Sequence, residues 1–250
     1  MRLIFFVLIL LTSNIIYSQD IAKIIQEGDT FETKMDENSA LNKYLEAYKS
    51  DPNNVVLLCK ISELYSSIAG RFKTDPAKQS AYFTSALNYA QKALAINPKS
   101  ADANFVMALV LGRTALKKSG KEKIDAVKGI KKYTDLSIQY NPNNYKAWFL
   151  LGKWYYEISG LNFFERAGVK LFYGELPNAS TKQAITSYNK SMELNNTFLY
   201  NYLALARAYV RDDNKDKAIE LLNTMLKLPL KTADDADIKT EARKLLKKIE

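Results

Sequence analysis

The residues that could do chemistry in this sequence are few, and their types exclude most kinds of active site. The 250 residues contain no histidine, so the commonest general base and metal ligand is missing. The single cysteine, Cys59, lies in the apolar stretch VVLLCKI, which indicates a buried and inert thiol. The sequence also has no glycine-rich phosphate-binding loop. We therefore expect a protein that is not an enzyme and carries no cofactor.

One acidic cluster has the spacing of a metal site. Asp212, Asn214 and Asp216 follow the order of the first ligands in a calcium-binding loop. Lys217 stands where that loop needs a glycine, and Asn223 stands where it needs a glutamate. The pattern therefore favours a solvated turn between two helices, and no metal site is predicted.

A run of lysines in the middle of the chain offers a surface for anions. It consists of Lys117, Lys118, Lys121, Lys123, Lys128, Lys131 and Lys132, in a chain with a formal net charge of +9. Such a run can bind lipid head groups or an acidic partner, or it can be an ordinary solvated face. Its first three lysines are our candidates for contact with an acidic membrane surface or a partner.

The segment SGLNFFERAGVKLFYGELPNAS, residues 159–180, has the most distinctive composition in the chain. Helical periodicity places one set of apolar residues on a single face: Phe163, Phe164, Ala167, Leu171 and Phe172. One interpretation is a short extra helix that packs over the edge of the protein. The other is a helix that walls a groove for a peptide or an acyl chain, together with Trp154 and Tyr156.

The two charges of this segment, Glu165 and Arg166, are adjacent, so on a helix they do not face each other and each needs a separate partner. The candidate binding residues of the region are Trp154, Tyr156, Phe163, Phe164, Arg166 and Phe172.

An internal repeat predicts the elements that position these residues. Its anchors are Pro52, Pro98, Pro142 and the aligned Asn196. Positions 6, 9, 10 and 13 residues after an anchor are large, large, small and large, which places them on one helical face. Positions 12 and 5 residues before an anchor are small and flank a larger residue, so that a neighbouring helix can approach closely; the copy before Pro142, with Ile130, matches less well. Because proline ends one helix and can open the next, the pattern predicts helical hairpins.

The fold class predicted is all-α, a tetratricopeptide-like solenoid with insertions inside its repeats. The anchors are separated by 46, 44 and 54 residues, whereas the standard unit has about 34. The extra residues must lie between the two helices of a pair, because the stripes around each anchor stay in phase. They contain residues 70–76, 117–123 and 159–180, which we expect on one edge, where such insertions often build a binding surface.

The expected elements follow from these anchors. Residues 20–50 form an incomplete first pair, residues 54–96 and 101–139 two more, residues 145–194 the pair with the large insertion, and residues 197–228 a compact pair. A final amphipathic helix over residues 234–249 caps the solenoid.

The N-terminus has the order of a secretory signal. Arg2 precedes an apolar run from Leu3 to Leu11, which is too short to span a bilayer comfortably, and Ser18 is a suitable cleavage site. We predict a signal peptide over residues 1–18 and one domain over residues 19–250. The protein is then exported to the periplasm or cell envelope; the alternative is an uncleaved N-terminal membrane anchor.

The second half of the chain resembles the regulator of microtubule dynamics protein family. The resemblance rests on the stretch LGKWYYEISGLNFFERAGVKLFYGELPNAST and on LPLKTADDADIKTEARKLLKKI. It implies a tetratricopeptide-like helical domain without catalytic residues. Eukaryotic relatives are associated with microtubules and organelle contacts, but an exported bacterial protein would not meet microtubules, so only partner or lipid binding carries over.

The function predicted is therefore that of a non-enzymatic binding or scaffold protein, which recognises a protein partner through the concave face and the inserted edge. The alternative is a lipid-binding or lipid-transfer protein with an apolar groove between the solenoid and a helix at residues 160–176. Export argues against nucleic acid as a partner, and the oligomeric state does not follow from the sequence.

Overall fold

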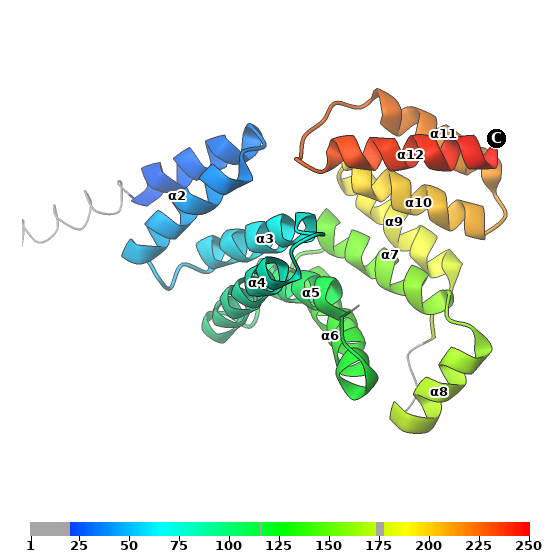
Figure 1. Ribbon diagram of the computed structural model, residues 1–250, viewed down its shortest axis with the longest axis horizontal. Coiled ribbons are helices and arrows are strands. Elements are labelled where there is room, and N and C mark those ends of the chain that lie inside the picture. Colours follow the sequence, from blue (N-terminus) through cyan, green and yellow to red (C-terminus); the bar gives the residue numbers. More distant parts are fainter. Residues whose placement is uncertain (1–20, 116, 174–177) are drawn as a thin grey trace, which may run out of the picture. The chain divides into compact units, whose positions relative to one another are not determined.

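The structure of the protein is a computed structural model, which describes residues 21–115, 117–173 and 178–250 (Figure 1). Within these ranges every regular element is an α-helix, as the sequence predicts. None of these helices combines the length and the apolar character needed to cross a bilayer. The signal peptide expected over residues 1–18 lies outside the described residues.

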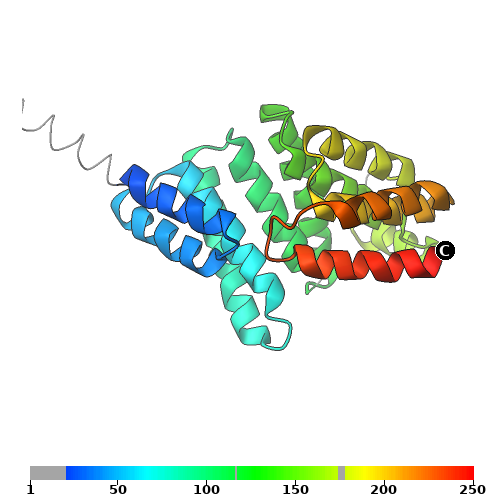
Figure 2. The same ribbon diagram turned by 90° about the horizontal axis from the view of Figure 1, so that it is seen from above.

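The chain forms two compact units, which are described separately. The first ends at Ile96 and contains a helical segment over residues 21–33 followed by α2 (Glu37–Ser50), α3 (Val55–Arg71) and α4 (Pro76–Ile96). The second begins at Asn97; its helices are α5 (Ala101–Ala115), α6 (Gly120–Tyr140), α7 (Tyr145–Ser159), α8 (Phe163–Tyr173), α9 (Thr181–Leu194), α10 (Leu199–Arg211), α11 (Lys215–Lys227) and α12 (Asp235–Ile249) (Figures 1 and 2). The single domain over residues 19–250 stays a prediction.

The repeat stripes form the core of both units, which confirms the spacing argument. The helices pack as the pairs α3 with α4, α5 with α6, α7 with α9 and α10 with α11. The small positions before the anchors are completely buried: Ala40, Ala47, Ala86, Ala93, Ser137, Ala184 and Ser191. The capping helix α12 buries Ile238 and Ala242 against the core of its unit, as expected for the end of a solenoid.

The residue six positions after an anchor binds the carbonyl oxygen of that anchor in three repeats. Trp148 Nε1 donates to Pro142 O at 2.8 Å, and the Tyr202 hydroxyl donates to Asn196 O at 2.9 Å. Asn104, which fits the apolar pattern poorly, is completely buried, and its Nδ2 donates to Pro98 O at 2.9 Å. In these three repeats the residue is therefore a hydrogen-bond donor that satisfies a carbonyl near the start of a helix, whereas the repeat of Pro52 has the buried Leu58 at this position.

A glycine packed under a tyrosine ring closes two of the hairpins. At Gly152 in α7, an added Cβ would lie 2.6 Å from Cδ1 of Tyr188 in α9, whose side chain is 1% exposed. Gly28 has the same relation to Tyr44, which is fully buried. Residues 21–33 therefore pack on α2 as α7 packs on α9, so the first pair shares the central contact of a later one.

The insertions mostly lengthen helices. The helices α4 and α6 have 21 residues each, against 13 in α10 and in α11, and only residues 72–75 separate α3 from α4. The insertion at residues 159–180 instead forms the separate helix α8 between the paired helices α7 and α9, as predicted.

Candidate binding surfaces

Helix α8 begins with a capping box that is local to the insertion. Asn162 Oδ1 accepts from Glu165 N at 2.9 Å, and Glu165 Oε2 accepts from Asn162 N at 2.8 Å. This reciprocal pair satisfies two backbone donors that the first turn of a helix leaves open. The start of the helix is therefore stabilised by residues of the insertion itself.

Arg166 attaches α8 to the end of α7. Its Nε donates to Leu161 O at 3.2 Å, and its Nη2 donates to Ile158 O at 2.5 Å. Both acceptors are backbone carbonyls at the end of α7 or just beyond it, where a helix leaves carbonyls without internal partners. Arg166 and Glu165 thus have separate partners, as predicted, and Arg166 has a positioning role.

The apolar face of α8 points away from the protein. Phe163 is 78% exposed, Phe164 is 82% exposed and Leu171 is 77% exposed. The partly buried residues of the helix are Arg166, Gly168 and Val169, on the other side. The short extra helix expected at the edge is formed, but its apolar face does not make the contact, because the partly buried residues are Arg166, Gly168 and Val169. The side chain of Phe172 lies outside the described residues.

Trp154 and Tyr156 do not form a groove wall with these phenylalanines. Trp154 is 4% exposed, and its Nε1 donates to Val127 O at 2.9 Å, which places it in the core between α6 and α7. The half-buried Tyr156 ring is covered by Arg211, whose guanidinium carbon lies 3.3 Å from the ring centroid. The apolar groove expected between the solenoid and residues 160–176 is therefore not formed by these side chains.

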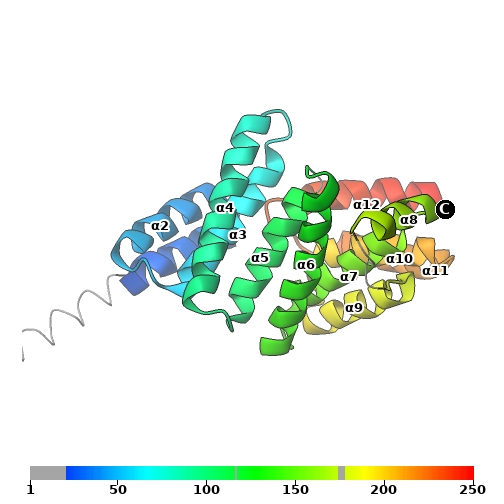
Figure 3. The same ribbon diagram turned by 90° about the horizontal axis from the view of Figure 1, so that it is seen from below.

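The lysine run lies beside α8 in the second unit. Lys117 and Lys118 precede α6, while Lys121 and Lys123 lie in its first turns, and of these four only Lys118 is partly buried. The hydrogen bond from Trp154 to Val127 joins the second half of α7 to the first half of α6, and α8 contacts α6 (Figures 1 and 3). The two insertions of this unit therefore share one edge, as predicted for them.

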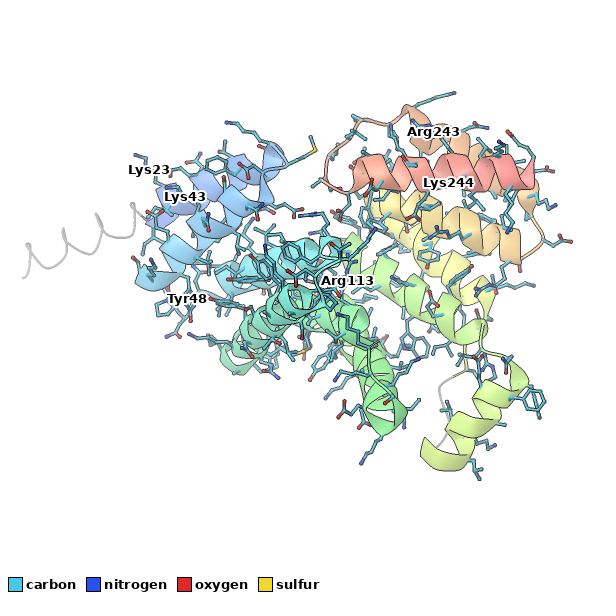
Figure 4. The ribbon with its side chains drawn as sticks, viewed as in Figure 1. Lys23, Lys43, Tyr48, Arg113, Arg243 and Lys244 are labelled. Atoms are coloured by element: carbon cyan, nitrogen blue, oxygen red, sulfur yellow. The ribbon has the colours of Figure 1, made fainter. Side chains whose placement is uncertain are left out.

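The repeat counting missed a second surface, which the first helices of successive pairs form together. The helix α7 contacts both α5 and α10, so these three helices lie side by side. Arg113 from α5 (labelled in Figure 4), Lys153 from α7 and Arg207 from α10 gather on it, and we call it the α5–α7–α10 face. Arg207 Nη2 also pairs with Glu241 Oε2 of α12 at 2.7 Å.

The electrostatics of the α5–α7–α10 face centre on Lys153. Reduced hydration among the surrounding protein atoms lowers its pKa, and the positive charges of Arg113 and Arg207 lower it further, while Glu157 opposes them. The residue is nevertheless exposed to solvent. A cation in this position gains from a bound anion, because the anion relieves the repulsion from its neighbours.

Aromatic rings border these cations. Phe149 of α7 lies with its ring centroid 5.1 Å from that of Phe198 and 6.1 Å from that of Tyr200. Burial raises the pKa of Tyr200, and the positive charge of Arg113, together with a hydrogen bond from it, partly opposes this. The face thus combines half-buried aromatic rings with positive charges, the composition that binds a peptide with both apolar and acidic side chains.

A simple signal in the sequence points to this face. Lys153 and Arg207 both lie eleven residues after their anchors, and Arg113, Glu157 and Arg211 lie fifteen residues after theirs. These offsets are four residues apart, so they share one side of the helix, away from the core stripe. Only the apolar positions of the repeat were counted, and the charged ones were therefore overlooked.

Comparison with known proteins agrees with this architecture. The sequence matches the family described as Regulator of microtubule dynamics protein 1-3 over residues 24–250. The chain belongs to this family. Relatives within it include Regulator of microtubule dynamics protein 1 of Caenorhabditis elegans, 27% identical over 161 residues, which are 64% of this chain and 71% of that protein. The same protein of Bos taurus is 24% identical over 91% of this chain and 72% of its own length.

Solved structures share the fold of this family member. A thermophilic TPR protein from Thermus thermophilus aligns with a TM-score of 0.66 over 90% of this chain and 98% of its own, at 14% identity. PilF of Pseudomonas aeruginosa aligns with a TM-score of 0.55 over 93% of each chain, at 13% identity. The first of these confirms a tetratricopeptide-like fold.

Proposed function

We propose that this protein is a non-enzymatic scaffold that binds an acidic segment of a partner protein on the α5–α7–α10 face. The observation that carries this proposal is the convergence of Arg113, Lys153 and Arg207, one from each of three neighbouring helices. A row of parallel helices presents a long surface on which an extended or helical peptide can lie. The tetratricopeptide-like fold supports a scaffold role, because stacked helical pairs present extended surfaces to a partner.

The charges favour an acidic ligand over a neutral one. Two positive side chains, Arg113 and Arg207, disfavour the charged form of Lys153, and among the described residues Lys153 forms no ion pair. A carboxylate placed among these groups makes charge-assisted hydrogen bonds, which are about twice as strong as neutral ones. The neighbouring rings of Phe149 and Tyr200 supply apolar area next to the charges.

The test uses fluorescence anisotropy with a labelled acidic peptide of alternating glutamate and leucine, and a peptide of the same length with glutamine in place of glutamate. We expect the acidic peptide to bind more tightly, and Lys153→Glu/Arg207→Glu to weaken it at least about tenfold. The matched control is Arg243→Glu/Lys244→Glu, which makes the same charge change at exposed positions of α12 (Figure 4).

Equal binding of the two peptides, or equal losses in both double variants, would contradict an acidic ligand on this face. Affinity capture from the native cell extract then identifies the partner itself. A partner that the wild type retains and that Lys153→Glu/Arg207→Glu loses, while the α12 control keeps it, supports the proposal.

A further inference from the structure

The outward face of α8 is the largest gathering of exposed apolar side chains in the described residues. Three of the eight large hydrophobic residues that are exposed lie on this one helix: Phe163, Phe164 and Leu171. On a helical wheel they fall within one arc of about a quarter turn, together with the exposed Ala167. Soluble proteins seldom expose apolar side chains together in this way without an interaction partner.

Positive charge surrounds this face. Over residues 117–135 the chain carries seven lysines against Glu122, Asp125 and Asp135, of which Asp135 pairs with Lys131 at 2.6 Å. Most of this segment belongs to α6, the helix that α8 contacts. The helix itself adds Lys170 next to the apolar arc. The surface therefore combines exposed aromatic residues with a cationic border.

We propose that α8 and the start of α6 dock on an anionic lipid bilayer. In this arrangement Phe163, Phe164 and Leu171 insert into the interface, and the lysines before and within α6 contact the head groups. An amphipathic helix that lies in the interface needs an apolar face on one side and basic residues near it. Each lysine near an anionic surface strengthens binding about fivefold. The docked helix keeps the contacts of Arg166 to α7, because that side chain is partly buried and its guanidinium group is bonded to carbonyl oxygens at the end of α7.

The size of the face favours a membrane over a protein partner. A helix of 11 residues is about 16 Å long. Its 11 residues are fewer than the roughly 20–30 residues that a standard protein interface takes from each partner. A bilayer needs no complementary groove, and its binding strength follows the apolar area and the charge that the protein offers.

The experiment is co-sedimentation of the full chain with phosphatidylcholine vesicles, with and without phosphatidylglycerol. We expect binding to the anionic vesicles that weakens with salt and that Phe163→Ser/Phe164→Ser lowers at least about tenfold. The matched control is Val56→Ser/Leu230→Ser, which removes two exposed apolar side chains elsewhere and leaves binding within about twofold of wild type.

A second pair of variants tests the charges. Lys121→Glu/Lys123→Glu is expected to weaken binding to the anionic vesicles at least about tenfold, whereas Arg243→Glu/Lys244→Glu changes it by about threefold or less. Fluorescence added by Phe164→Trp is expected to be quenched by brominated acyl chains, which places the residue in the bilayer interface. All of the substituted residues are exposed, so the thermal unfolding of every variant should match that of wild type.

Several results overturn the proposal. Unchanged vesicle binding in Phe163→Ser/Phe164→Ser means that another segment binds the membrane, and absent quenching of Phe164→Trp has the same meaning. A dimer in light scattering that this double variant dissociates, without vesicle binding, assigns the face to a second copy of the chain.

Discussion

The guanidinium group of Arg211 in α10 lies over the ring of Tyr156 in α7, 3.3 Å from its centroid, and donates to the Tyr156 carbonyl oxygen. The same group reaches Ser159 Oγ at 3.4 Å and approaches Gly160, the C-cap residue of α7. One side chain therefore ties the end of α7 to the next first helix. It also supplies positive charge where a helix accumulates negative potential.

Arg211→Ala should lower the free energy of unfolding by about 1–2 kcal/mol, because it removes a cation–π contact and a partner of the terminal carbonyls of α7. Urea unfolding followed by circular dichroism measures this change. Arg243→Ala is the control, because Arg243 is exposed on α12 and should change stability by less than about 0.5 kcal/mol. Equal effects of the two substitutions would contradict a structural role for Arg211.

Gly152→Ala and Gly168→Ala should have opposite effects. Alanine is favoured over glycine in a helix by about 1 kcal/mol. At Gly168 in α8 nothing lies within 4 Å of an added Cβ, so we expect a gain of up to that amount. At Gly152 the added Cβ would lie 2.6 Å from the buried Tyr188 ring, so we expect a net loss of about 1–2 kcal/mol.

Thermal unfolding of the two alanine variants compares them directly. A gain at Gly152 would mean that the Tyr188 ring moves freely, and the close packing of α7 on α9 would then lose its support. Tyr188→Leu in the Gly152→Ala background should recover part of the loss, because it removes the ring that the new methyl group meets.

A polar cluster in the first unit should make stability depend on pH at both ends of the range. Lys60 Nζ lies 2.8 Å from Asp29 Oδ1, 3.0 Å from Glu32 Oε2 and 3.2 Å from the Tyr44 hydroxyl. Burial raises the pKa of Asp29, but hydrogen bonds from Lys60 and Tyr44 outweigh it and lower the pKa below its ordinary value. Burial and the two carboxylates raise the pKa of Tyr44. Burial lowers the pKa of Lys60, but its acidic partners raise it overall.

The sign of each contribution follows from these directions. The lowered pKa of Asp29 stabilises the fold above pH about 4, and this contribution is lost as the pH falls through the lowered value. The raised pKa values of Tyr44 and Lys60 stabilise it below pH about 10, and this contribution is lost as the pH rises through the raised values. We expect Lys60→Met to destabilise the protein at neutral pH and to flatten its acid dependence.

These effects are measured as urea unfolding midpoints between about pH 3 and about pH 11, because carboxyl, tyrosine and lysine groups ordinarily titrate within this range. Lys43→Met is the control, because Lys43 pairs with Glu27 and Glu46 at the surface (Figure 4), where ion pairs contribute little. If the acid dependence of Lys60→Met equals that of wild type, the cluster does not hold the pKa of Asp29 low.

The pKa of Lys153 should respond to its neighbours and to an acidic ligand. Reduced hydration lowers it, as do Arg113 and Arg207, so Arg207→Gln should raise it toward the ordinary value of about 10.4. The acidic peptide should raise it as well, because an anion stabilises the charged lysine. Carbon-13 NMR of reductively methylated lysines follows the titration, with Lys153→Arg to assign the signal. A Lys153 pKa that neither change moves would remove the electrostatic basis of the proposed peptide site.

The core was predictable from the sequence because each repeat of a solenoid buries residues at the same positions. The spacing of large and small residues placed Ala184, Tyr188 and Leu205 in the core, and the turn residues after Pro142 marked the start of α7. Periodicity also found α8, since Phe163 and Leu171 have helical spacing. It could not tell which side of α8 faces the solenoid, because an apolar face says nothing of what covers it.

The binding surfaces were harder to predict for the same physical reason. Trp154 and Val127 meet through a backbone carbonyl, which leaves no mark in a pattern of side chains. Arg113 and Lys153 come together only when two helices lie side by side. Their offsets from the anchors were readable, but a charged position in a repeat becomes a candidate site only when its neighbours in space are known.

The attachment of α8 has a consequence for how this segment can change. Arg166 bonds to backbone carbonyls, and the cap of Asn162 and Glu165 is local, so the helix is held by groups that do not depend on its outward side chains. The residues of its exposed face can therefore be substituted without altering the fold. A helix with a different exposed face could thus replace α8 between α7 and α9, provided that it keeps Asn162, Glu165 and Arg166.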